Sequence, residues 1–344
     1  MNIIKPTYEI IEQDFNNDIF VNMFKHIEKC GRTCYKSDDK ITEDSYKKFV
    51  DNLTKSKHCA MLEHATVYLT IPIGTPVDDY QYMWKMDIVK FFKQNKYSVV
   101  NNKRINKTID VEIKGYGMKT QASATFYFIT TNWRVIIENE DLDIIKYFRN
   151  NYNIDKEKLK ESILQWMTSP TEDHEKRYTV KFTCDIGVSR EFNRHRVDSI
   201  AEESTRYCNY SKDKFGGELN IVKPVWISED DTNQWSNIGY DIVDYCNDIV
   251  YNKDDEFTVI DYWLFSNLAA EYSYLNLIRL GWKPQEARII LPLDTKTELI
   301  HTAFESDWKH FFDLRALGTT GAPHPSAKEL AEPLMNEFKN KGYI

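Results

Sequence analysis

Runs of alternating apolar and polar residues constrain the fold of this chain most. Tyr178-Thr-Val-Lys-Phe-Thr-Cys-Asp-Ile-Gly187 alternates in this way, and so does His64-Ala-Thr-Val-Tyr-Leu-Thr-Ile-Pro72 before its closing proline. Successive side chains of an extended chain point to opposite faces, so both runs predict strands with one buried face. Further strands are predicted at Leu219–Val225 and Thr297–Phe304.

Helical patterns surround these strands. Cys30–Ser37 reads as a helix end followed by a turn. A long helical region is predicted from about Asn237 to Leu280, where apolar residues recur at helical spacing: Leu264, Leu268, Leu275 and Ile278. Gly281 is expected to stop it, and Pro284 suits the first turn of the next helix. After the last strand come a helix to about Leu314, a Gly/Pro-rich loop and a final helix.

The stretch from Ile73 to about Lys176 is rich in Lys, Asn and Asp and contains no chemical motif. Its pattern predicts one strand, Ala124–Thr130, and two helices, Asp141–Asn150 and Lys156–Met167. We interpret it as an insertion at about 73–176 in a single domain spanning 1–344.

Composition excludes several classes of function. With 42% hydrophobic and 14% aromatic residues the chain can bury a sizeable core. No basic start precedes an apolar run, and no stretch approaches the roughly 18 apolar residues of a membrane helix, which predicts a soluble, cytoplasmic protein without a membrane partner. The net charge of -8 argues against a nucleic-acid partner. The six cysteines form no Cys-x-x-Cys pair, so neither a disulfide framework nor a metal site is predicted.

Arginines are concentrated in one short segment. Only 12 of the 45 basic residues are arginines, yet four of them fall between Arg190 and Arg206. A guanidinium donates two parallel hydrogen bonds to phosphate or carboxylate, a geometry that lysine cannot copy. The segment, with Ser199 and Ser204 as neutral donors, is read as a short helical stretch ending near Tyr210. It predicts either an anion site or a solvated helix face with internal ion pairs.

Glu202 and His195 bear on the choice between an anion site and a solvated helix face. In a helix Glu202 and Arg206 would lie four residues apart on one face. His195 stands between two arginines, which disfavours its protonated form and suits it to act as a neutral hydrogen-bond partner.

The run Arg194-His-Arg-Val-Asp-Ser-Ile-Ala-Glu-Glu-Ser-Thr-Arg-Tyr207 resembles the signature of the flavin-dependent thymidylate synthases. Three further segments agree with that family in the same order: Leu62-Glu-His64, Ala287-Arg-Ile-Ile-Leu-Pro292 and Phe312-Asp-Leu-Arg-Ala316. The resemblance covers roughly residues 28–72 and 176–336. It implies an α+β fold with a central mixed or antiparallel sheet, flanking helices and a long helical segment, to which the inserted α/β segment is added.

The resemblance also assigns site residues. It implies FAD contacts from His64, Thr66, Arg194, His195, Arg196, Glu202, His310 and His324. It implies a dUMP site formed by Glu191, Arg194, Glu202, Glu203, Ser204, Thr205, Arg206, Arg288 and Arg315. Among these, Arg206 and Arg288 would hold the phosphate. Arg315 would be catalytic, because a cation beside the uracil ring stabilises its deprotonated form.

Simpler roles remain open for three of these residues. His64 is alternatively a core histidine bonded to Glu63, Arg288 a cap on a local helix through Glu286, and Arg315 a helix-end cation beside Asp313. The chain also departs from the family, since Glu191 replaces a common glutamine, while Ala201, Phe304 and His310 stand where asparagine occurs in members.

The resemblance implies reductive methylation of dUMP to dTMP, with FAD and NADPH as cofactors, methylenetetrahydrofolate as co-substrate, and a homotetramer with shared active sites. Arg315 and Arg206 of one site would then come from different chains. No cysteine stands in the Pro-Cys-His context of the classical thymidylate synthases. The alternatives are a non-catalytic nucleotide- or nucleic-acid-binding protein, a flavoprotein that acts on another nucleotide, and a degenerate family member kept for assembly.

Overall fold

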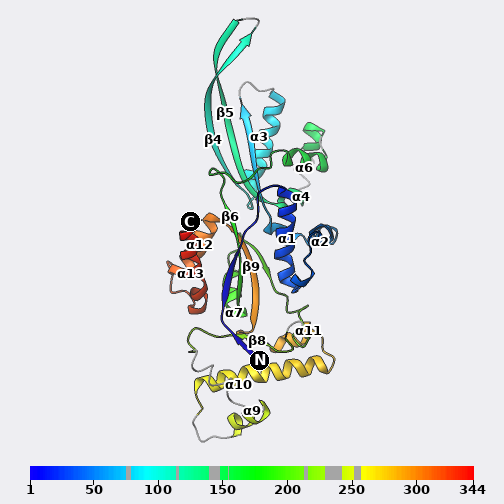
Figure 1. Ribbon diagram of the computed structural model, residues 1–344, viewed down its shortest axis with the longest axis vertical. Helices are drawn as coiled ribbons and strands as arrows, with labels where there is room; N and C mark the ends of the chain where they lie inside the picture. Colours follow the sequence, from blue (N-terminus) through cyan, green and yellow to red (C-terminus); the bar gives the residue numbers. More distant parts are fainter. Residues whose placement is uncertain are drawn as a thin grey trace.

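The computed structural model describes residues 1–74, 79–113, 116–138, 148–153, 155–212, 216–228, 242–251 and 257–344. The molecule is elongated, with a four-stranded sheet at its centre, a β-hairpin projecting at one end and the long helix α10 at the other (Figure 1). These elements give the predicted α+β fold, with a central antiparallel sheet between helices.

The central sheet has the strand order β2-β6-β9-β7, and all neighbours are antiparallel. Its strands are β2 (Thr7–Ile11), β6 (Arg177–Asp185), β9 (Lys296–Phe304) and β7 (Ser199–Glu202). The predicted strands at Tyr178–Gly187 and Thr297–Phe304 are confirmed as β6 and β9. Strands β2 and β7 are short, and neither was predicted, because pairing with β6 and β9 rather than their own pattern makes them extended.

A second sheet joins β3 (Thr66–Gly74), β5 (Tyr116–Asn132) and β4 (Val99–Ile113) in antiparallel order β3-β5-β4. The strand predicted before Pro72 is confirmed, as is the run at Ala124–Thr130, which is part of β5. The segment that we interpreted as an insertion therefore supplies β4 and β5, which form one sheet with β3, a strand that begins before this segment. Helix α3 (Asp79–Gln94) and strand β4 were not predicted. Strand β4 was missed because its Lys- and Asn-rich start lacks apolar alternation.

At the opposite end β1 (Asn2–Ile4) pairs in parallel with β8 (Asn220–Val222), which lies within the predicted Leu219–Val225 strand. The long helical region is represented by two helices, α9 (Ile242–Tyr251) and α10 (Val259–Arg279), while its predicted first residues lie outside the described part of the chain. Thr258 and Asp261 form a capping box that starts α10. Gly281, with a φ of 102°, follows its end, and Pro284 opens α11 (Pro284–Ala287), both as predicted.

Helices cover both faces of the central sheet (Figure 1). On one side lie α1 (Ile19–Tyr35) and α2 (Ser45–Lys55), and on the other α12 (Glu305–Phe312) and α13 (Pro325–Asn340), with α7 (Ile186–Phe192) following β6. Helix α1 ends within the predicted Cys30–Ser37 turn region, where Lys36 adopts a left-handed φ of 47°. The core beneath α12 and α13 is aromatic and includes Trp308, Phe311 and Phe312.

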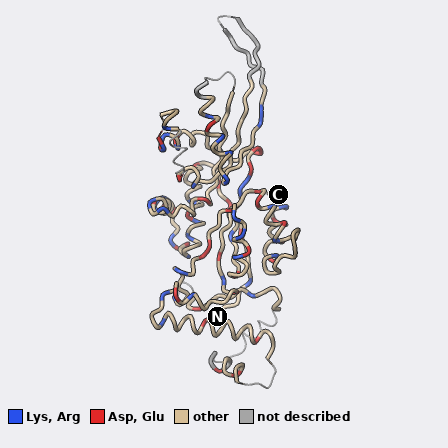
Figure 2. Tube along the Cα trace, turned by 180° about the vertical axis from the view of Figure 1, so that it is seen from behind, with Lys and Arg blue, Asp and Glu red and all other residues tan. Residues whose placement is uncertain are grey.

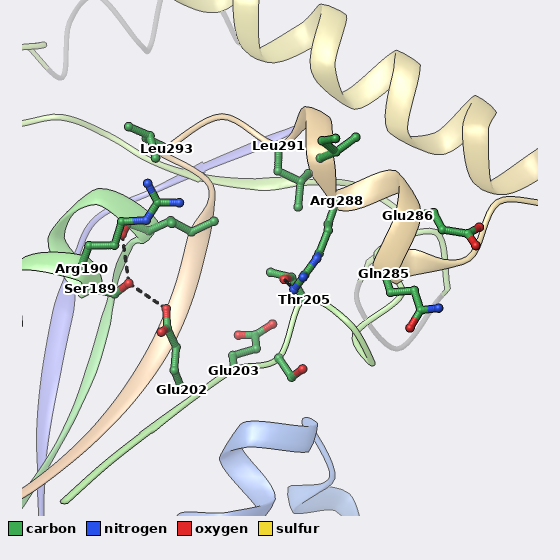
Figure 3. A pocket seen from close by; sticks show the side chains of 13 residues that line it. Ser189, Arg190, Glu202, Glu203, Thr205, Gln285, Glu286, Arg288, Leu291 and Leu293 are labelled. Carbon is green, nitrogen blue, oxygen red and sulfur yellow. Dashed lines mark hydrogen bonds between the residues drawn. The ribbon is translucent and has the colours of Figure 1, made fainter. Parts of the chain in front are cut away.

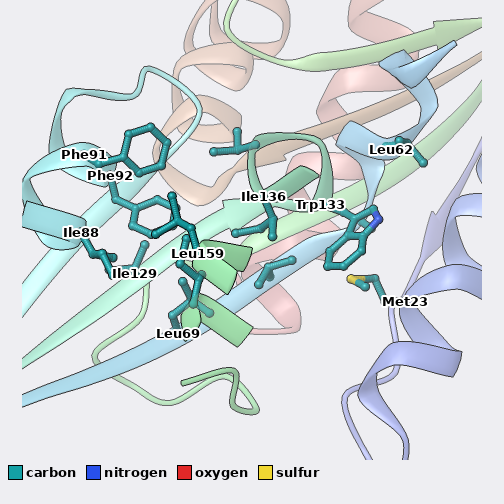
Figure 4. Close-up of a cluster of buried hydrophobic side chains, with 14 of the residues drawn as sticks. Met23, Leu62, Leu69, Ile88, Phe91, Phe92, Ile129, Trp133, Ile136 and Leu159 are labelled. Carbon is teal, nitrogen blue, oxygen red and sulfur yellow. The ribbon is translucent and has the colours of Figure 1, made fainter. Parts of the chain in front are cut away.

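A separate core lies between the three-stranded sheet and its helices (Figure 4). Trp133 in α4 (Trp133–Ile137), Met23 in α1 and Leu69 in β3 belong to it, beside Leu159 in α6 (Lys156–Leu164). Helix α6 confirms the prediction at 156–167, whereas residues 141–147 of the other predicted helix lie outside the described residues. None of the helices in the described ranges has both the length and the apolar character of a membrane span.

Candidate functional site

The arginine-rich segment forms a helix, a turn and a strand, so the prediction of a helical stretch ending near Tyr210 is wrong. After α7 the chain turns and enters β7, where Ala201 pairs with Ile300 of β9. The free edge of β9 offers a complete ladder of backbone partners, which overrides local helical preference. Glu202 and Arg206 are therefore not stacked on a helix face, and no helix start lies at Ser204.

A cavity of about 850 Å³ opens where β7 ends (Figure 3). It is lined by residues from α7, the end of β7, and the α11 segment with the loop that follows: Ile186, Ser189, Arg190, Glu202, Glu203, Ser204, Thr205, Gln285, Glu286, Arg288, Ile289, Leu291 and Leu293. Five residues predicted for the dUMP site lie together here. They come from two distant segments, residues 202–205 and Arg288.

Arg288 reaches across this cavity. Its Nη1 donates to Thr205 Oγ1 at 3.2 Å, and Figure 3 shows the carboxylates of Glu202 and Glu203 between Arg190 and Arg288. The alternative role for Arg288 was a cap on a local helix through Glu286. Arg288 is the C-cap residue of α11, but Glu286 accepts from the backbone N–H of Lys283 at 2.8 Å. Arg288 is exposed.

The two glutamates of the cavity are held differently. Glu202 accepts hydrogen bonds from Ser189 Oγ at 2.7 Å and Asn193 Nδ2 at 3.1 Å. Glu203 is buried and accepts from Lys296 Nζ at 2.7 Å. Lys296 also pairs with Glu298, at 2.9 Å. The carboxylates therefore form part of a supporting framework, and the sequence pattern did not indicate the role of Lys296.

Glu298 is the centre of this framework. Lys36, Lys181 and Lys296 all pair with its carboxylate. Burial alone raises the pKa of the Glu298 carboxyl, but Lys296 and Lys36 hold that pKa at about 2, below its ordinary value. Glu298 is thus ionised at neutral pH, and the lysines of the framework offset the buried carboxylates of Glu203 and Glu298 beneath the cavity.

A second, smaller cavity of about 160 Å³ lies between the turn after α7 and the end of α12. It is lined by Arg194, His195, Arg196, Val197, Asp198, Asp307, His310, Leu314 and Arg315. Four residues predicted to contact FAD and the predicted catalytic arginine meet here. Arg194 and Arg315 were also predicted for dUMP, so five of the nine residues predicted for dUMP line the large cavity, two line the small one, and Glu191 and Arg206 line neither.

Arg315 is the most constrained arginine of this cavity. Its Nη1 donates to Glu191 Oε2 at 2.6 Å, its Nη2 to the Glu191 carbonyl oxygen at 2.6 Å, and its Nε to His195 Nε2 at 3.3 Å. Arg315 lies in the last turn of the helical segment that begins at Asp313, as the helix-end alternative predicted, but its guanidinium pairs with Glu191. Within the predicted set, Glu191 thus contacts the catalytic candidate directly.

The backbone around Arg315 is unusual. Residues Asp313–Leu317 form a π-helical turn, η5, an arrangement that is rare and common at functional sites. Gly318 follows with a φ of 69°, and a Cβ there would lie 2.7 Å from Pro323 Cδ. Only glycine permits this chain reversal, which directs the Arg315 side chain toward α7.

His195 is neutral, as its neighbours predicted, although the main cause differs. Burial lowers the pKa of His195 to about 4, and His301 adds to this effect. Since Nε2 accepts from Arg315, the ring proton lies on Nδ1. His301 itself is fully buried and bonds Asp198 at 2.6 Å, a pair that the sequence did not indicate.

His64 and Thr66 lie apart from both cavities described above. His64 is fully buried, and its Nδ1 lies 2.8 Å from Thr302 Oγ1, so the alternative pairing with Glu63 is wrong. Its Nε2 has no hydrogen-bond partner among the described residues. Thr66 begins β3 and lines a third cavity of about 270 Å³.

A chain of buried hydrogen bonds connects His64 to a second histidine. Thr302 Oγ1 lies 2.8 Å from Thr179 Oγ1, which lies 3.2 Å from His26 Nε2. Burial, together with the charges of Lys29 and Arg177, lowers the pKa of His26 to about 4. The pKa of His64 is also well below its ordinary value, chiefly because of burial.

These histidines make stability depend on pH. The folded pKa of His26 is lower than the unfolded one, so the unfolded chain binds a proton that the folded chain excludes. The contribution of His26 to the free energy of unfolding is therefore fully present above pH 6.5 and is lost as the pH falls toward 4. We expect His26→Gln to reduce the loss of unfolding free energy between pH 7 and 5.5 by about 1 kcal/mol, measured by urea denaturation.

The exposed His58 provides the matched control, since His58→Gln should leave the pH dependence of wild type unchanged. An equal loss of stability in His26→Gln and wild type would show that His26 is protonated in the folded chain.

The remaining predicted residues are exposed. Arg206 lies with its guanidinium 5.6 Å from the Tyr207 ring centroid and is not among the lining residues of the large cavity. His324 precedes α13 and lies edge-on to Trp226, at 6.0 Å between ring centroids. Their predicted ligand contacts stay predictions. The structure adds Ser189, Arg190 and Gln285 to the cavity, and only Arg190 carried a sequence signal, as part of the arginine cluster.

Comparisons with known proteins identify the family. The model of the family described as "Thymidylate synthase complementing protein" matches residues 123–341. No curated protein sequence matches the chain.

Two solved structures of a UMP/dUMP methylase PolB from Streptomyces cacaoi are similar at low levels. The complex with 5-Br dUMP has a TM-score of 0.38 and 13% identity, covering 99% of this chain and 93% of that one. The complex with 5-Br UMP has a TM-score of 0.35 and 20% identity, covering 48% and 68%. The family model matches more than half of the chain and agrees with the motifs: the chain belongs to the thymidylate synthase complementing proteins, the flavin-dependent thymidylate synthases.

Proposed function

We propose that this enzyme converts dUMP to dTMP, with FAD and NADPH as cofactors and methylenetetrahydrofolate as the one-carbon donor. The observation that carries the proposal is the convergence of residues 202–205 and Arg288 on one cavity of about 850 Å³. These residues come from two motifs that lie more than 80 residues apart in the sequence, and they line the same cavity. A volume of this size suits a nucleotide, since ligand pockets span roughly 300–1,000 Å³.

The nucleotide phosphate is assigned to the side of the cavity formed by Arg288, Ser204 and Thr205. A phosphate would find there a guanidinium and two hydroxyls, the donors that bind it most strongly. Lys296 pairs with the neighbouring carboxylate of Glu203, which reduces the repulsion that this carboxylate would exert on a phosphate. Arg206 is proposed as a further phosphate ligand.

The residues at the small cavity suit an anionic cofactor. Arg194 has a side chain that is 73% exposed, and Arg196 and His310 are also exposed. These side chains would hold FAD through its phosphates. Bound FAD would supply the hydride for the reaction. The role of Arg315 is to hold a permanent positive charge beside the uracil ring, which stabilises the deprotonated ring and makes its carbon more nucleophilic.

The division of site residues between two cavities supports a shared active site. The small cavity, at about 160 Å³, is below the usual size of a ligand pocket, so one chain encloses only part of a bound ligand. We propose a homotetramer in which each site combines the large cavity of one subunit with Arg315 of another, and a cytoplasmic location for the assembly.

The nucleic-acid-binding alternative has no comparable support. Figure 2 shows Lys and Arg interspersed with Asp and Glu along the described chain, in keeping with the net charge of -8. A binder of nucleic acid would instead concentrate cations on one face.

Visible absorption under anaerobic conditions tests the proposal. The protein, loaded with FAD, is mixed with NADPH with and without dUMP. We expect the flavin band to bleach, faster with dUMP present, and dTMP to form once methylenetetrahydrofolate is added. A protein that fails to take up FAD would refute the proposed activity, and faster turnover of UMP or dCMP would refute the substrate.

The same assay on Arg288→Ala tests the phosphate position. We expect the dUMP concentration for half-maximal rate to rise about 10- to 100-fold, the effect of losing one charge-assisted hydrogen-bond partner. Arg279→Ala on α10, which also removes an exposed arginine, is the control and should behave as wild type.

A further inference from the structure

Glu191 and Arg315 form the closest contact between α7 and the π-helical turn η5. The Glu191 carboxylate accepts from Nη1 and its carbonyl oxygen accepts from Nη2, both at 2.6 Å. One residue thus satisfies both terminal nitrogens of the guanidinium. The Arg315 side chain is only 13% exposed, so these bonds lie in a region of low dielectric where they orient the group strongly.

The Arg315 guanidinium has more N–H donors than its contacts with Glu191 use. A guanidinium carries five N–H groups. Glu191 takes two of them and His195 Nε2 takes a third, at 3.3 Å. Among the described residues no further acceptor is bonded to Arg315, so one N–H on each terminal nitrogen remains for a ligand.

Both acceptors are themselves fixed. Glu191 lies in α7, whose start is capped by Asp185 accepting from the Val188 N–H at 2.6 Å. The next residue, Phe192, is fully buried, with its ring 5.0 Å from that of Phe311 in α12. The His195 ring lies against Phe311 as well, at 5.0 Å. Packing therefore holds the backbone of α7 at Glu191 and the ring of His195 in place, so both acceptors approach Arg315 from fixed positions in the fold.

The resemblance placed Glu191 in the dUMP site, but its carboxylate already faces two cations. Oε2 bonds Arg315, and Oε1 lies 3.9 Å from Arg194 Nη1. A carboxylate between cations has no donor of its own to offer a nucleotide. Glutamate also binds a guanidinium more strongly than glutamine does, because the hydrogen bond is charge-assisted. The glutamate at position 191, in place of the family's common glutamine, therefore strengthens the contact with Arg315.

We propose that Glu191 is a positioning residue for Arg315, which it orients through its carboxylate and carbonyl oxygen, and that it does not contact the nucleotide. The proposal rests on the proposed function of Arg315 at the uracil ring. The family motif alone assigns both residues to the dUMP site. We give them different roles: Arg315 acts on the substrate, and Glu191 acts only through Arg315.

A double-mutant cycle of Glu191→Ala and Arg315→Ala tests this role, with FAD-loaded protein and two readouts, dUMP affinity and the single-turnover rate of dTMP formation. Glu191→Ala should lower the rate by about 10²-fold, the effect of a misplaced reacting group. The double variant should match Arg315→Ala within about twofold in both readouts, because a residue that acts only through Arg315 has no effect once Arg315 is gone. Glu191→Gln keeps an oxygen acceptor and should recover most of the rate.

Two results would overturn the proposal. A double variant that binds dUMP markedly more weakly than Arg315→Ala would give Glu191 its own contact with the nucleotide. A faster rate in Glu191→Ala would show that the pair restrains Arg315 rather than orients it. If wild type binds dUMP without turnover, the proposed function fails, and the affinity cycle still decides the role of Glu191. Thermal melts of all variants verify folding, which is expected because the Glu191 side chain is 32% exposed.

Discussion

Replacing Arg315 by alanine is expected to leave FAD bound and to lower kcat for dTMP formation by about 10²- to 10³-fold, the usual effect of removing one preorganised donor to a developing charge. Its guanidinium has two N–H groups without an acceptor among the described residues, and it lines a partly buried cavity. The measurement is single-turnover dTMP formation, with flavin absorbance recording cofactor content.

Two further variants make this result specific. Arg315→Lys keeps the charge but loses the planar fork that Glu191 and His195 hold, so we expect it to recover only a small part of the rate. Lys309→Ala removes a cation from the exposed side of α12, where it pairs with Glu305, and should leave kcat unchanged. Wild-type turnover in Arg315→Ala would remove this residue from the mechanism.

The second large effect concerns stability. Trp308→Ala should destabilise the folded chain by about 3–5 kcal/mol, the range for truncating a large buried aromatic side chain. Trp308 is fully buried, its ring lies 5.2 Å from those of Phe311 and Phe338, and its indole N–H donates to the Tyr178 carbonyl at 3.1 Å. Removing it would leave both a cavity and an unpaired carbonyl. Denaturant unfolding at constant protein concentration measures the change.

Trp226 provides the comparison for this prediction. It is 64% exposed, so Trp226→Ala should change the free energy of unfolding by less than about 0.5 kcal/mol. A loss of stability in Trp308→Ala no larger than in this control would mean that α12 does not depend on its aromatic core. The same core fixes the position of η5 and Arg315, so a partial loss of turnover is expected in Trp308→Ala at temperatures near its midpoint.

Several elements were predictable because their signals are local. β3 and β6 show apolar alternation along their own residues, and the end of α10 is marked by Gly281 and Pro284. The family motif likewise depends on residue types in a fixed order. From that order alone residues 202–205 and Arg288 were predicted to share one site, and these residues line one cavity.

The errors share one cause, which is pairing between distant segments. Ser199–Glu202 carries no strand pattern, yet β9 offers it an open edge and extends it. β4 is rich in Lys and Asn, and its position depends on β5. The alternative bond of His64 to its neighbour Glu63 was also wrong, because the folded chain supplies Thr302, and Glu191 as the partner of Arg315 was not predicted.

The sequence by itself determined the secondary structure of the central strands, the family and the chemical types present in the site, because periodicity and residue identity are properties of short segments. Only the tertiary structure decided which acceptors hold Arg315, which lysines support Glu203, and how the predicted residues divide between two cavities. Hydrogen bonds and ion pairs depend on distances of about 3 Å between groups. Such distances are set by the packing of whole elements, and residue spacing along the chain does not encode them.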